Sequence, residues 1–396
     1  MLARLIQLEC KMWLKSIIFY AYIILLFLFY VTQMGEDTSF KKPQPGQMDY
    51  GTTYSKDQNI IMKGTVRDLL FEHSQGHYVS YPYGFYKEVI LSKKDESKME
   101  EYLTSLTGKS KEERINPEDF NIRPGLSFEE FKSIMNKVAH IIGPGSEYSE
   151  NALQRHGRQP RTYEQALSDY NNVISKDHIT GAFGRLFCDY MGIILGILPA
   201  FFSIARVLRD KRSKCSDVVF SKKGASMDIV LSRYVGMIIV MFLPLILVSC
   251  LSLSQAVYIA QASQVSPDYF AFIKYSLGWL LPTMMFVTAI SYWISELTGS
   301  VLTIFAGVAI WFLSIFTGMG ANLVNVGWNL IPRFNVLGEH ERYKALLPEL
   351  IKNRVFYTVI SSIVVLMVIV VVEWKRNGGG FTHGKVSQNF IREHKI

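Results

Sequence analysis

Six stretches of the sequence are apolar over enough residues to cross a lipid bilayer. A transmembrane helix needs about 20 mostly apolar residues, because the backbone must satisfy its own hydrogen bonds inside roughly 30 Å of hydrocarbon. The six predicted transmembrane helices cover residues 16–34, 184–206, 231–254, 276–295, 300–319 and 354–373. No small-residue cleavage site follows the first of them, so we expect it to remain as an anchor. The pattern predicts an α-helical polytopic membrane protein.

The segment 1–15, before the first predicted transmembrane helix, alternates apolar and polar side chains. Leu2, Leu5, Leu8 and Met12 recur among charged residues at roughly helical spacing. This pattern is typical of a helix that lies in the membrane interface. It fits a simple extension of the first transmembrane helix equally well.

The distribution of Lys and Arg predicts how the chain is oriented in the membrane. Basic residues are abundant near the N-terminus, after the second predicted helix and in the C-terminal tail, whereas the short loop at about 254–275 carries only Lys274. Loops rich in Lys and Arg stay in the cytoplasm. We therefore expect a plasma-membrane protein with both termini cytoplasmic. The expected cytoplasmic segments are 1–15, 207–230 and 374–396, and the expected outer segments are 35–183 and 320–353.

Residues 35–183 predict a large extracellular domain inserted between the first two transmembrane helices. Its start is rich in Gly, Pro, Thr and Lys and reads as a linker, and residues 98–106 have a helical pattern. Ser127 and Thr162 each begin a capping-box sequence that starts a helix. A short strand pair is expected within 78–91. About 110 residues after the linker suffice for a small core, so we expect a mainly helical domain, α or α+β.

The net charge of +8 belongs to the membrane part of the chain. Residues 35–185 hold 20 basic and 22 acidic side chains, so the excess lies outside them. A nucleic-acid-binding protein would instead concentrate Lys and Arg within its folded soluble domain. The charge distribution therefore argues against nucleic acid as a partner and favours a lipid membrane.

Several patterns that can indicate chemistry do not add up to a site. None of the four cysteines lies within 36–183 and none forms a close pair, which excludes a disulfide-stapled outer domain and gives no metal site. Gly108-Lys109-Ser110 resembles the end of a phosphate-binding loop, but Leu103 stands where the first glycine is required. His73 and His77 lack the glutamate of a zinc protease motif. The sequence therefore gives no case for an enzyme.

The loop 207–230 carries the most distinctive local pattern in the chain. A basic stretch, Arg206–Arg212, leads into a short apolar group that is followed by a turn of small and basic residues. A loop that only anchors the protein by its positive charge needs no apolar centre such as Phe220. The pattern predicts a short amphipathic helix that docks on a soluble partner. The candidate contact residues are Asp217, Val218, Val219, Phe220, Lys222 and Lys223.

This layout resembles the permease subunits of ABC transporters of the type-2 exporter class. In that family a charged stretch after the second span leads to a short coupling helix and a return helix near a basic-aromatic-glycine pattern, here Arg233-Tyr234-Val235-Gly236. The likeness implies that about residues 213–224 contact a separate ATPase subunit, which binds ATP and Mg while this chain holds no cofactor. It also implies a second permease subunit, identical or different. The proline often found at the turn is absent, since Gly224–Ser226 occupies that position.

Three residues of the predicted spans are candidates for a substrate path or gate. Asp189 is an acidic residue inside the second span, where a charge is costly and often functional. The resemblance implies that spans two and five border the path, which adds Pro199 and Trp311 as candidates. Purely structural roles fit equally well: Asp189 paired with Arg185, Pro199 as an ordinary kink, and Trp311 in packing.

The resemblance favours an ATP-driven exporter of a peptide, an antibiotic or a lipid-like compound. The sodium-extruding branch of the same family is an alternative, because it also has a large loop between its first two spans. A membrane sensor or scaffold, with a ligand-binding outer domain and no transport, belongs to another class, and a membrane enzyme to a third. Co-purification of an ATPase would separate transport from both.

Overall fold

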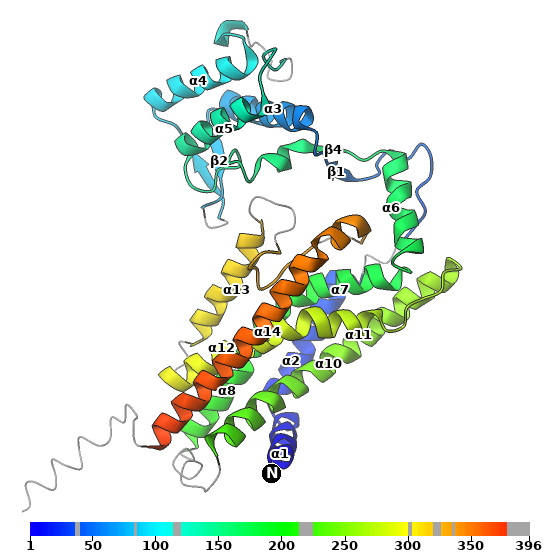
Figure 1. Cartoon of the computed structure of the whole chain (residues 1–396), viewed down its shortest axis with the longest axis vertical. Helices are drawn as coiled ribbons and strands as arrows, with labels where there is room; N and C mark the ends of the chain where they lie inside the picture. Colours follow the sequence, from blue (N-terminus) through cyan, green and yellow to red (C-terminus); the bar gives the residue numbers. More distant parts are fainter. Residues whose placement is uncertain are drawn as a thin grey trace, which may run out of the picture.

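The computed structural model describes residues 1–35, 40–82, 85–113, 120–213, 225–299, 303–319, 326–334 and 337–377. The molecule is elongated (Figure 1). A bundle of long helices forms one part, and a smaller domain lies beyond one end of it. The helix α1, Leu2–Leu14, lies at the opposite end of the bundle from that domain.

The bundle contains the apolar helices that the sequence predicts. In the described part of the chain, five helical segments are long and apolar enough to cross a membrane. They are Ile17–Met34 (α2), Thr180–Arg212 (α7, Thr180–Leu195, and α8, Leu198–Arg212), Ser226–Ala262 (α10), Ala271–Thr298 (α11, Ala271–Tyr275, a π-helical turn, Ser276–Leu280, and α12, Leu281–Thr298) and His340–Arg376 (α14). The fifth predicted span falls on α13, Thr303–Met319, whose apolar part is the shorter Thr303–Ile315.

Two of these helices are longer than the spans predicted from hydropathy. Each of α10 and α14 has 37 residues, which at 1.5 Å per residue is about 55 Å, well beyond the hydrocarbon thickness of roughly 30 Å. The apolar pattern marks only the part of a helix that faces lipid or core. The polar continuation of α14 toward the inserted domain carries His340, Tyr343 and Arg354, which the functional site uses.

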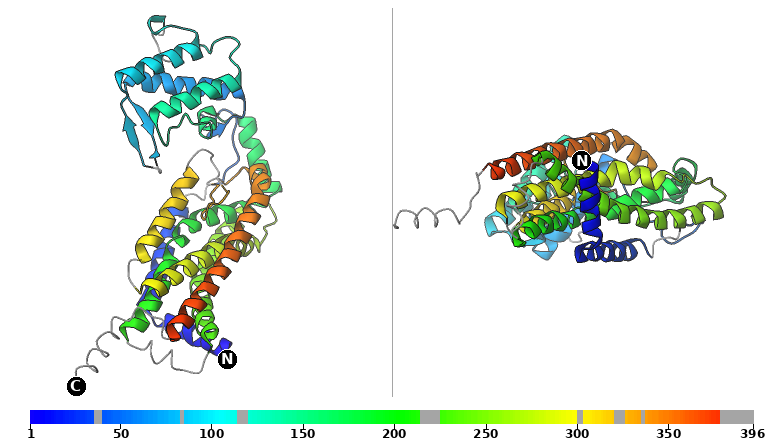
Figure 2. Two further views of the ribbon diagram at one scale, coloured as in Figure 1. Left: turned by 60° about the vertical axis from the view of Figure 1, so that its left-hand side comes forward. Right: turned by 90° about the horizontal axis from the view of Figure 1, so that it is seen from below.

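The first helix, α1, is separate from α2. Ser16 has an extended backbone, with φ −92° and ψ 136°, and its hydroxyl accepts the backbone N–H of Ile18, so it caps the start of α2. The chain turns there, and α1 lies across the end of the bundle (Figure 2). Its Trp13 is buried against Phe202 of α8, with ring centroids 4.7 Å apart. Because α1 packs beside α10 as well, it is a part of the bundle and not a free tail.

The smaller domain, which we call the inserted domain, comprises residues 52–160. It has its own core, formed mainly by the helices α3, Gln58–Gln75, α4, Lys93–Thr107, and α5, Phe128–Ile142. Strands β1, Thr52–Tyr54, and β4, Arg158–Pro160, pair antiparallel where the chain enters and leaves the domain. The helix α6, Tyr163–Ser175, then leads back to the bundle. Two short 3-10 helices, Lys111–Glu113 and Leu153–Gly157, also belong to the domain.

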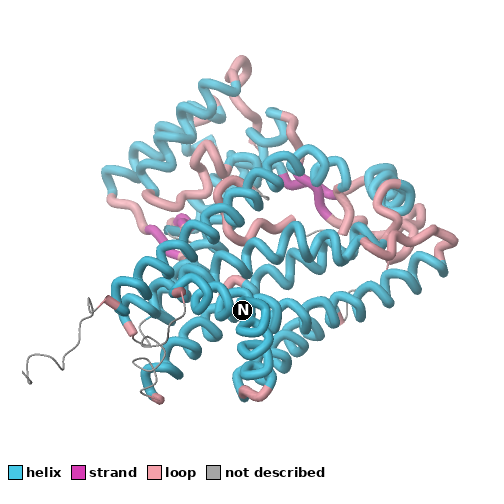
Figure 3. The backbone as a smooth tube through the Cα atoms, turned by 60° about the horizontal axis from the view of Figure 1, so that its bottom comes forward, coloured by secondary structure: helices cyan, strands magenta, loops and turns pink. Residues whose placement is uncertain are grey.

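The predicted local structure of the inserted domain is confirmed. The expected helix at 98–106 lies within α4. Ser127 caps α5 by accepting the N–H of Glu130, and Thr162 and Gln165 form a complete capping box at the start of α6. Strands β2, Tyr78–Ser80, and β3, Lys87–Val89, form the expected pair, with Tyr78 opposite Val89. Figure 3 draws the strands of the chain in magenta among the helices. Gly108 ends α4 with φ +69°, so Gly108-Lys109-Ser110 follows a helix C-terminus, where no phosphate-binding loop can form.

Candidate functional site

The predicted docking residues fall outside the part of the chain that the structure describes. Asp217, Val218, Val219, Phe220, Lys222 and Lys223 all lie within 214–224. The two helices that flank this segment are described: α8 ends at Arg212 and α10 begins at Ser226. These two helix ends connect the segment to the bundle along the chain.

A buried ionic cluster joins both flanking helices to α1. The guanidinium of Arg206 in α8 donates to both carboxylate oxygens of Glu9 in α1, at 2.9 and 2.7 Å, and to Asp210 at 2.5 Å. The other carboxylate oxygen of Asp210 accepts from Arg233 of α10, also at 2.5 Å. Both guanidinium groups are buried, with Arg206 6% and Arg233 4% exposed. Two bases and two acids therefore bind three helices together as a neutral unit.

The chemistry of this cluster makes it rigid. A guanidinium that binds a carboxylate through two parallel bonds has its orientation fixed as well as its position. If one partner moves away, a buried charge is left without compensation, which costs about 3–5 kcal/mol. The ends of α1, α8 and α10 are therefore expected to move together.

Further bonds connect the same two ends to α12 and α14. Near the end of α8, Lys211 donates to the backbone oxygen of Gly299, the residue that ends α12, at 2.9 Å. At the start of α10, the hydroxyl of Ser226 donates to Glu373 of α14 and accepts from Arg376 at 2.8 Å. The end of α14 is in turn tied to α12, since Lys375 binds the carboxylate of Glu296 at 2.8 Å. We call these bonds, with the ionic cluster, the flanking network.

The second apolar segment is interrupted where α7 meets α8. Residues 196 and 197 lie between the two helices, and Pro199 is the second residue of α8. A proline lacks the N–H that a helix interior needs, but it fits the first turn, where that group has no partner. Pro199 therefore starts a new helix and does not kink a continuous one. The N–H of Trp311 in α13 donates to the carbonyl of Ile193 at 2.8 Å, which joins α13 to the interruption.

A buried non-helical segment, residues 326–334, fills the space next to this interruption. Ile331 is 2% exposed, and its side chain packs so tightly on Gly196 that a Cβ added there would lie 2.5 Å from the Ile331 Cδ1. Asp189 of α7 accepts the backbone N–H of Phe334 at 2.9 Å. Asp189, Pro199 and Trp311 thus all border one region, the contact between α7, α8, α13 and this segment.

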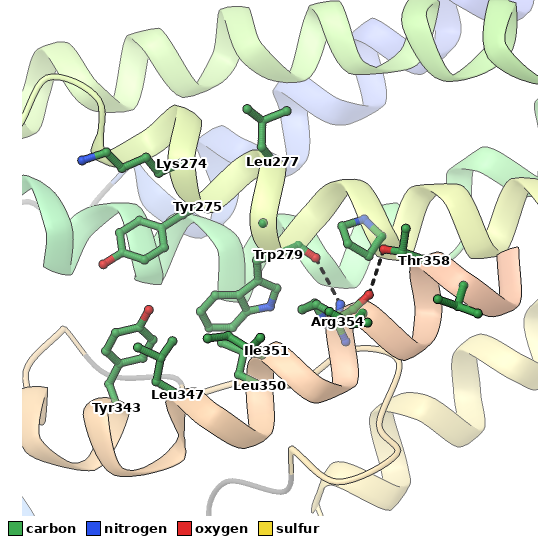
Figure 4. A pocket seen from close by; sticks show the side chains of 14 residues that line it. Lys274, Tyr275, Leu277, Trp279, Tyr343, Leu347, Leu350, Ile351, Arg354 and Thr358 are labelled. Atoms are coloured by element: carbon green, nitrogen blue, oxygen red, sulfur yellow. Dashed lines mark hydrogen bonds between the residues drawn. The ribbon is translucent and has the colours of Figure 1, made fainter. Parts of the chain in front are cut away.

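Arg354 and Asn353 of α14 hold the segment from the other side. Asn353 donates to the carbonyl oxygens of Val326, Gly327 and Asn329. Arg354 donates to the carbonyl oxygens of Asn329 and Leu330, and to the hydroxyl of Thr283 at the start of α12. It also donates to the carbonyl oxygen of Trp279 in the π-helical turn (Figure 4). Buried carbonyl groups without a helix to pair in are costly in a membrane. These two side chains therefore make an irregular segment tolerable within the bundle.

Figure 4 also shows that Arg354 lies at a cavity between α14 and the π-helical turn before α12. The cavity has a volume of about 490 Å³ and a largely apolar lining that includes Trp279, Leu350 and Ile351. Tyr275 and Tyr343 also line it. The cavity can admit an apolar group, but the donors of Arg354 already have protein acceptors.

The predicted pairing of Asp189 with Arg185 was wrong. The carboxylate that Arg185 binds through two bonds, at 2.6 and 2.7 Å, is Asp177, which precedes α7. Asp177 also binds His340 at the start of α14, at 2.7 Å. The guanidinium of Arg185 stacks over the ring of Tyr343, 4.6 Å from its centroid. This buried cluster connects the chain that leaves the inserted domain with α14.

Sequence reasoning missed Arg354, Asn353 and Glu9. The first two stand at the start of the predicted span 354–373 and resemble ordinary polar flanks, although both are buried. Glu9 resembles a solvated charge on the polar face of an interfacial helix. One signal could have marked Asn353 and Arg354. They form a polar pair that continues into an apolar helix, and a non-helical apolar segment precedes them in the chain.

The inserted domain contains a polar cluster of its own. His156 binds the carboxylate of Asp68 at 2.7 Å and stacks on Tyr148, whose hydroxyl donates to Glu72 at 2.9 Å. Burial raises the pKa of Glu72 to about 7, although bonds from Tyr148 and the backbone of Val79 act in the opposite direction. The cluster joins α3 to the end of the domain. Among the described residues no group of three or more His, Cys, Asp or Glu side chains is placed to hold a metal ion.

Comparison with known proteins identifies the family. A family model described as "ABC-2 family transporter protein" matches residues 3–374, which is nearly the whole chain. The protein therefore belongs to the ABC-2 transporter family, a family of membrane transport components that normally lack ATPase motifs of their own and work with ABC ATPase subunits. No curated protein and no solved structure matches the chain.

Proposed function

From this membership, we propose that the chain is the permease subunit of an ATP-driven exporter. Residues 213–224 dock on the ATPase subunit, both termini are cytoplasmic, and the inserted domain is outside the cell. The observation that carries the proposal is the flanking network, which ties both ends of the docking segment to α1, α12 and α14. A loop that served only as a charged anchor would need no such fixed frame.

The network explains how work done on an ATPase could reach the membrane part. When two ATPase subunits close on ATP, the docking segments move with them as rigid bodies. Because Arg206 and Arg233 both bind Asp210, the ends of α8 and α10 follow this movement together. The bonds from Lys211 to Gly299 and from Lys375 to Glu296 carry it to the turn after α12 and to α14.

The interruption between α7 and α8 is the proposed place where the path opens. The buried segment 326–334 packs on Gly196, and α13 is attached to the same place through Trp311. A rotation of α8 would separate α8 from the segment 326–334 and from α13. The substrate is proposed to be an amphipathic peptide, an antibiotic or a lipid-like compound, in keeping with the apolar lining of the bundle, and a second permease subunit is expected to complete the path.

The test replaces Phe220 by Asp and measures how much ATPase co-purifies with the full chain. An aromatic anchor at the centre of an interface contributes about 2 kcal/mol or more, so we expect the amount of bound ATPase to fall at least tenfold. The matched control is Phe71→Asp, because Phe71 is 60% exposed on α3 of the inserted domain, at the opposite end of the molecule from α8.

Equal ATPase recovery with both variants would contradict the docking proposal. Failure of the wild-type chain to bind any ATPase would contradict the exporter itself and favour a sensor or scaffold. The chain could also bind its ATPase and show no substrate-dependent ATP hydrolysis when the two are reconstituted together. That result would support the docking proposal and contradict the transport proposal.

A further inference from the structure

A groove runs along the surface of the bundle between α2 and α8, beginning where α1 turns into α2. Its volume is about 980 Å³, about twice that of the cavity beside Arg354. The lining is mainly apolar and includes Tyr22 and Leu25 of α2. Leu25 is 47% exposed, so the groove is open on the side that faces the surrounding lipid. Something apolar must cover this face in a membrane.

One end of the groove is strongly basic. Lys15, Arg209 and Arg212 line it, and all three side chains are exposed. In the described ranges none of the three forms an ion pair, whereas the neighbouring Arg206 is fully paired inside the bundle. The basic end is the end at α1, and therefore the end where the bundle emerges from the hydrocarbon. The three charges are free to bind an anion there.

The groove also contains a buried donor that lacks an acceptor. Trp13 forms part of the lining near the basic end, and its indole N–H has no hydrogen-bond partner within the described residues. An unmade hydrogen bond of a buried group is costly. A small rotation of this ring would allow the N–H to donate to an ester or phosphate oxygen that entered the groove.

The length of the groove fits a hydrocarbon chain. Ser16 and Leu25 both line it, and the nine helical steps from one to the other correspond to about 13.5 Å along the axis of α2. The groove presents positive charge at the interface, then a neutral polar donor, then an apolar track. A phospholipid has matching groups in the same order: its phosphate, its ester and its acyl chain.

We propose that this groove is a binding site for one anionic phospholipid, whose phosphate lies between Lys15, Arg209 and Arg212 and whose acyl chain follows α2 and α8. A second copy of the chain is a poorer occupant, because a symmetric contact would bring the same basic cluster against itself. A soluble polyanion would leave the apolar track uncovered. The site requires only that this end of the bundle lies at a membrane surface, so it does not depend on transport.

The lipid would also lie next to the flanking network. Arg209 and Arg212 are on the last turns of α8, one on each side of Asp210, which joins Arg206 to Arg233. A bound phosphate would hold these turns of α8 at the membrane surface.

The experiment is native mass spectrometry of the purified full-length chain, equilibrated with equal amounts of phosphatidylglycerol and phosphatidylcholine that have the same acyl chains. We expect the wild type to retain one phosphatidylglycerol in preference to phosphatidylcholine. Each Lys or Arg near an anionic lipid surface is worth about 1 kcal/mol, so Arg209→Gln with Arg212→Gln should lower this preference about tenfold or more. The matched control is Arg4→Gln with Lys11→Gln, the same loss of charge from exposed positions of α1 outside the groove.

A second variant tests the apolar track independently of charge. Leu25→Trp fills the groove with a bulky ring at an exposed site, so it is expected to lower the retention of phosphatidylglycerol several-fold while the chain still elutes as a folded protein. Equal retention of the two lipids by the wild type would overturn the proposal, and so would an equal loss in the control. If Leu25→Trp converted a dimer into a monomer without changing the bound lipid, a second copy would be the occupant and the proposal would be wrong.

Discussion

Arg354 shows how one side chain can keep an irregular backbone segment inside the bundle. Its guanidinium donates to backbone or side-chain oxygens of Asn329, Leu330, Trp279, Thr283 and Asn353. All of these acceptors are neutral, whereas Arg206 and Arg185 bind carboxylates. The charge is therefore compensated by several dipoles at once. Only a planar group with five donors can reach so many acceptors from one position.

Replacing Arg354 by Lys should destabilise the protein even though the charge is kept. An ammonium has three donors around one atom and cannot make all the bonds that the guanidinium makes to these buried oxygens, and each hydrogen bond to a charged group that is lost costs about 1.5–3 kcal/mol. We expect a clearly lower midpoint of thermal unfolding for the full chain in detergent. Arg342→Lys on the same helix, where Arg342 is 34% exposed and binds Glu339 through a single bond, is the control. Equal shifts for the two variants would rule out the clamping role.

Glu72 gives the inserted domain a stability that depends on pH. Its pKa of about 7 in the folded domain lies above the ordinary value of 4.5. Between these two values the folded state binds more protons than the unfolded state, so the stability contributed by this group is complete below pH 4.5 and is lost as the pH rises through 7. An acidic surrounding therefore favours the folded domain at this position.

Glu72→Gln should remove this dependence. The amide stays neutral at every pH in the window, so amide hydrogen exchange in α3, corrected for the intrinsic pH dependence of exchange, should show nearly the same protection at pH 5 and pH 7.5. In the wild-type chain protection should fall between these values, and Glu101→Gln, at an exposed position of α4, should behave as the wild type does. A parallel loss of protection in wild type and Glu72→Gln would show that another group titrates.

At the scale of elements, the interruption between α7 and α8 is where the bundle departs most from its hydropathy pattern. The hydropathy pattern predicts one continuous span over residues 184–206. The structure divides the same stretch, because Pro199 begins a helix and Gly196 allows Ile331 and Trp311 to approach the backbone closely. Hydropathy measures how apolar a stretch is and carries no information on what packs against a glycine.

Gly196→Ala should therefore be more harmful than an ordinary helix substitution. A Cβ at this position would lie 2.5 Å from Ile331 and 2.9 Å from Trp311, and such overpacking costs about 1–3 kcal/mol. Gly278→Ala is the control, since nothing lies within 4 Å of a Cβ built there. Thermal unfolding should separate the two variants. Adding Ile331→Ala should recover part of the loss, and strict additivity of the two changes would contradict the contact.

How much of the molecule the sequence predicts depends on the range of the interaction. Capping at Ser127 and Thr162 acts within four residues and was predicted, as were the apolar helices, which depend on a regional pattern. The bonds from Arg354 to Trp279 and from Arg206 to Glu9 join residues 75 and 197 positions apart. Nothing in a single sequence marks such partners. The candidates Asp189, Pro199 and Trp311 were brought into one region, but the segment between them was not foreseen.

At the scale of the whole molecule, the inserted domain and the bundle meet through a buried charge cluster. Asp177 binds Arg185 of α7 and His340 of α14, and it follows directly after α6, the helix that leads out of the inserted domain. The next two residues, His178 and Ile179, have positive φ angles of 51° and 60°. A β-branched residue in that conformation is held there by its surroundings. The orientation of the domain is therefore tied to α14.

Asp177→Asn should weaken this junction far more than its size suggests. It leaves the buried guanidinium of Arg185 without a counter-charge, a loss of about 3–5 kcal/mol, and the thermal unfolding midpoint of the full chain should fall accordingly. Lys176→Gln is the control, because the adjacent pair of Lys176 with Glu341 is exposed and such pairs contribute about 0–1 kcal/mol. If both variants unfold alike, the cluster does not hold the junction.

The pairing of β1 with β4 has a consequence for how such chains diversify. Thr52 lies opposite Pro160, so the polypeptide leaves and re-enters at neighbouring points. Any segment inserted between these strands, from a short turn to an unrelated fold, connects to the same two ends. A different domain can therefore stand between β1 and β4 without changing the arrangement of the helices of the bundle.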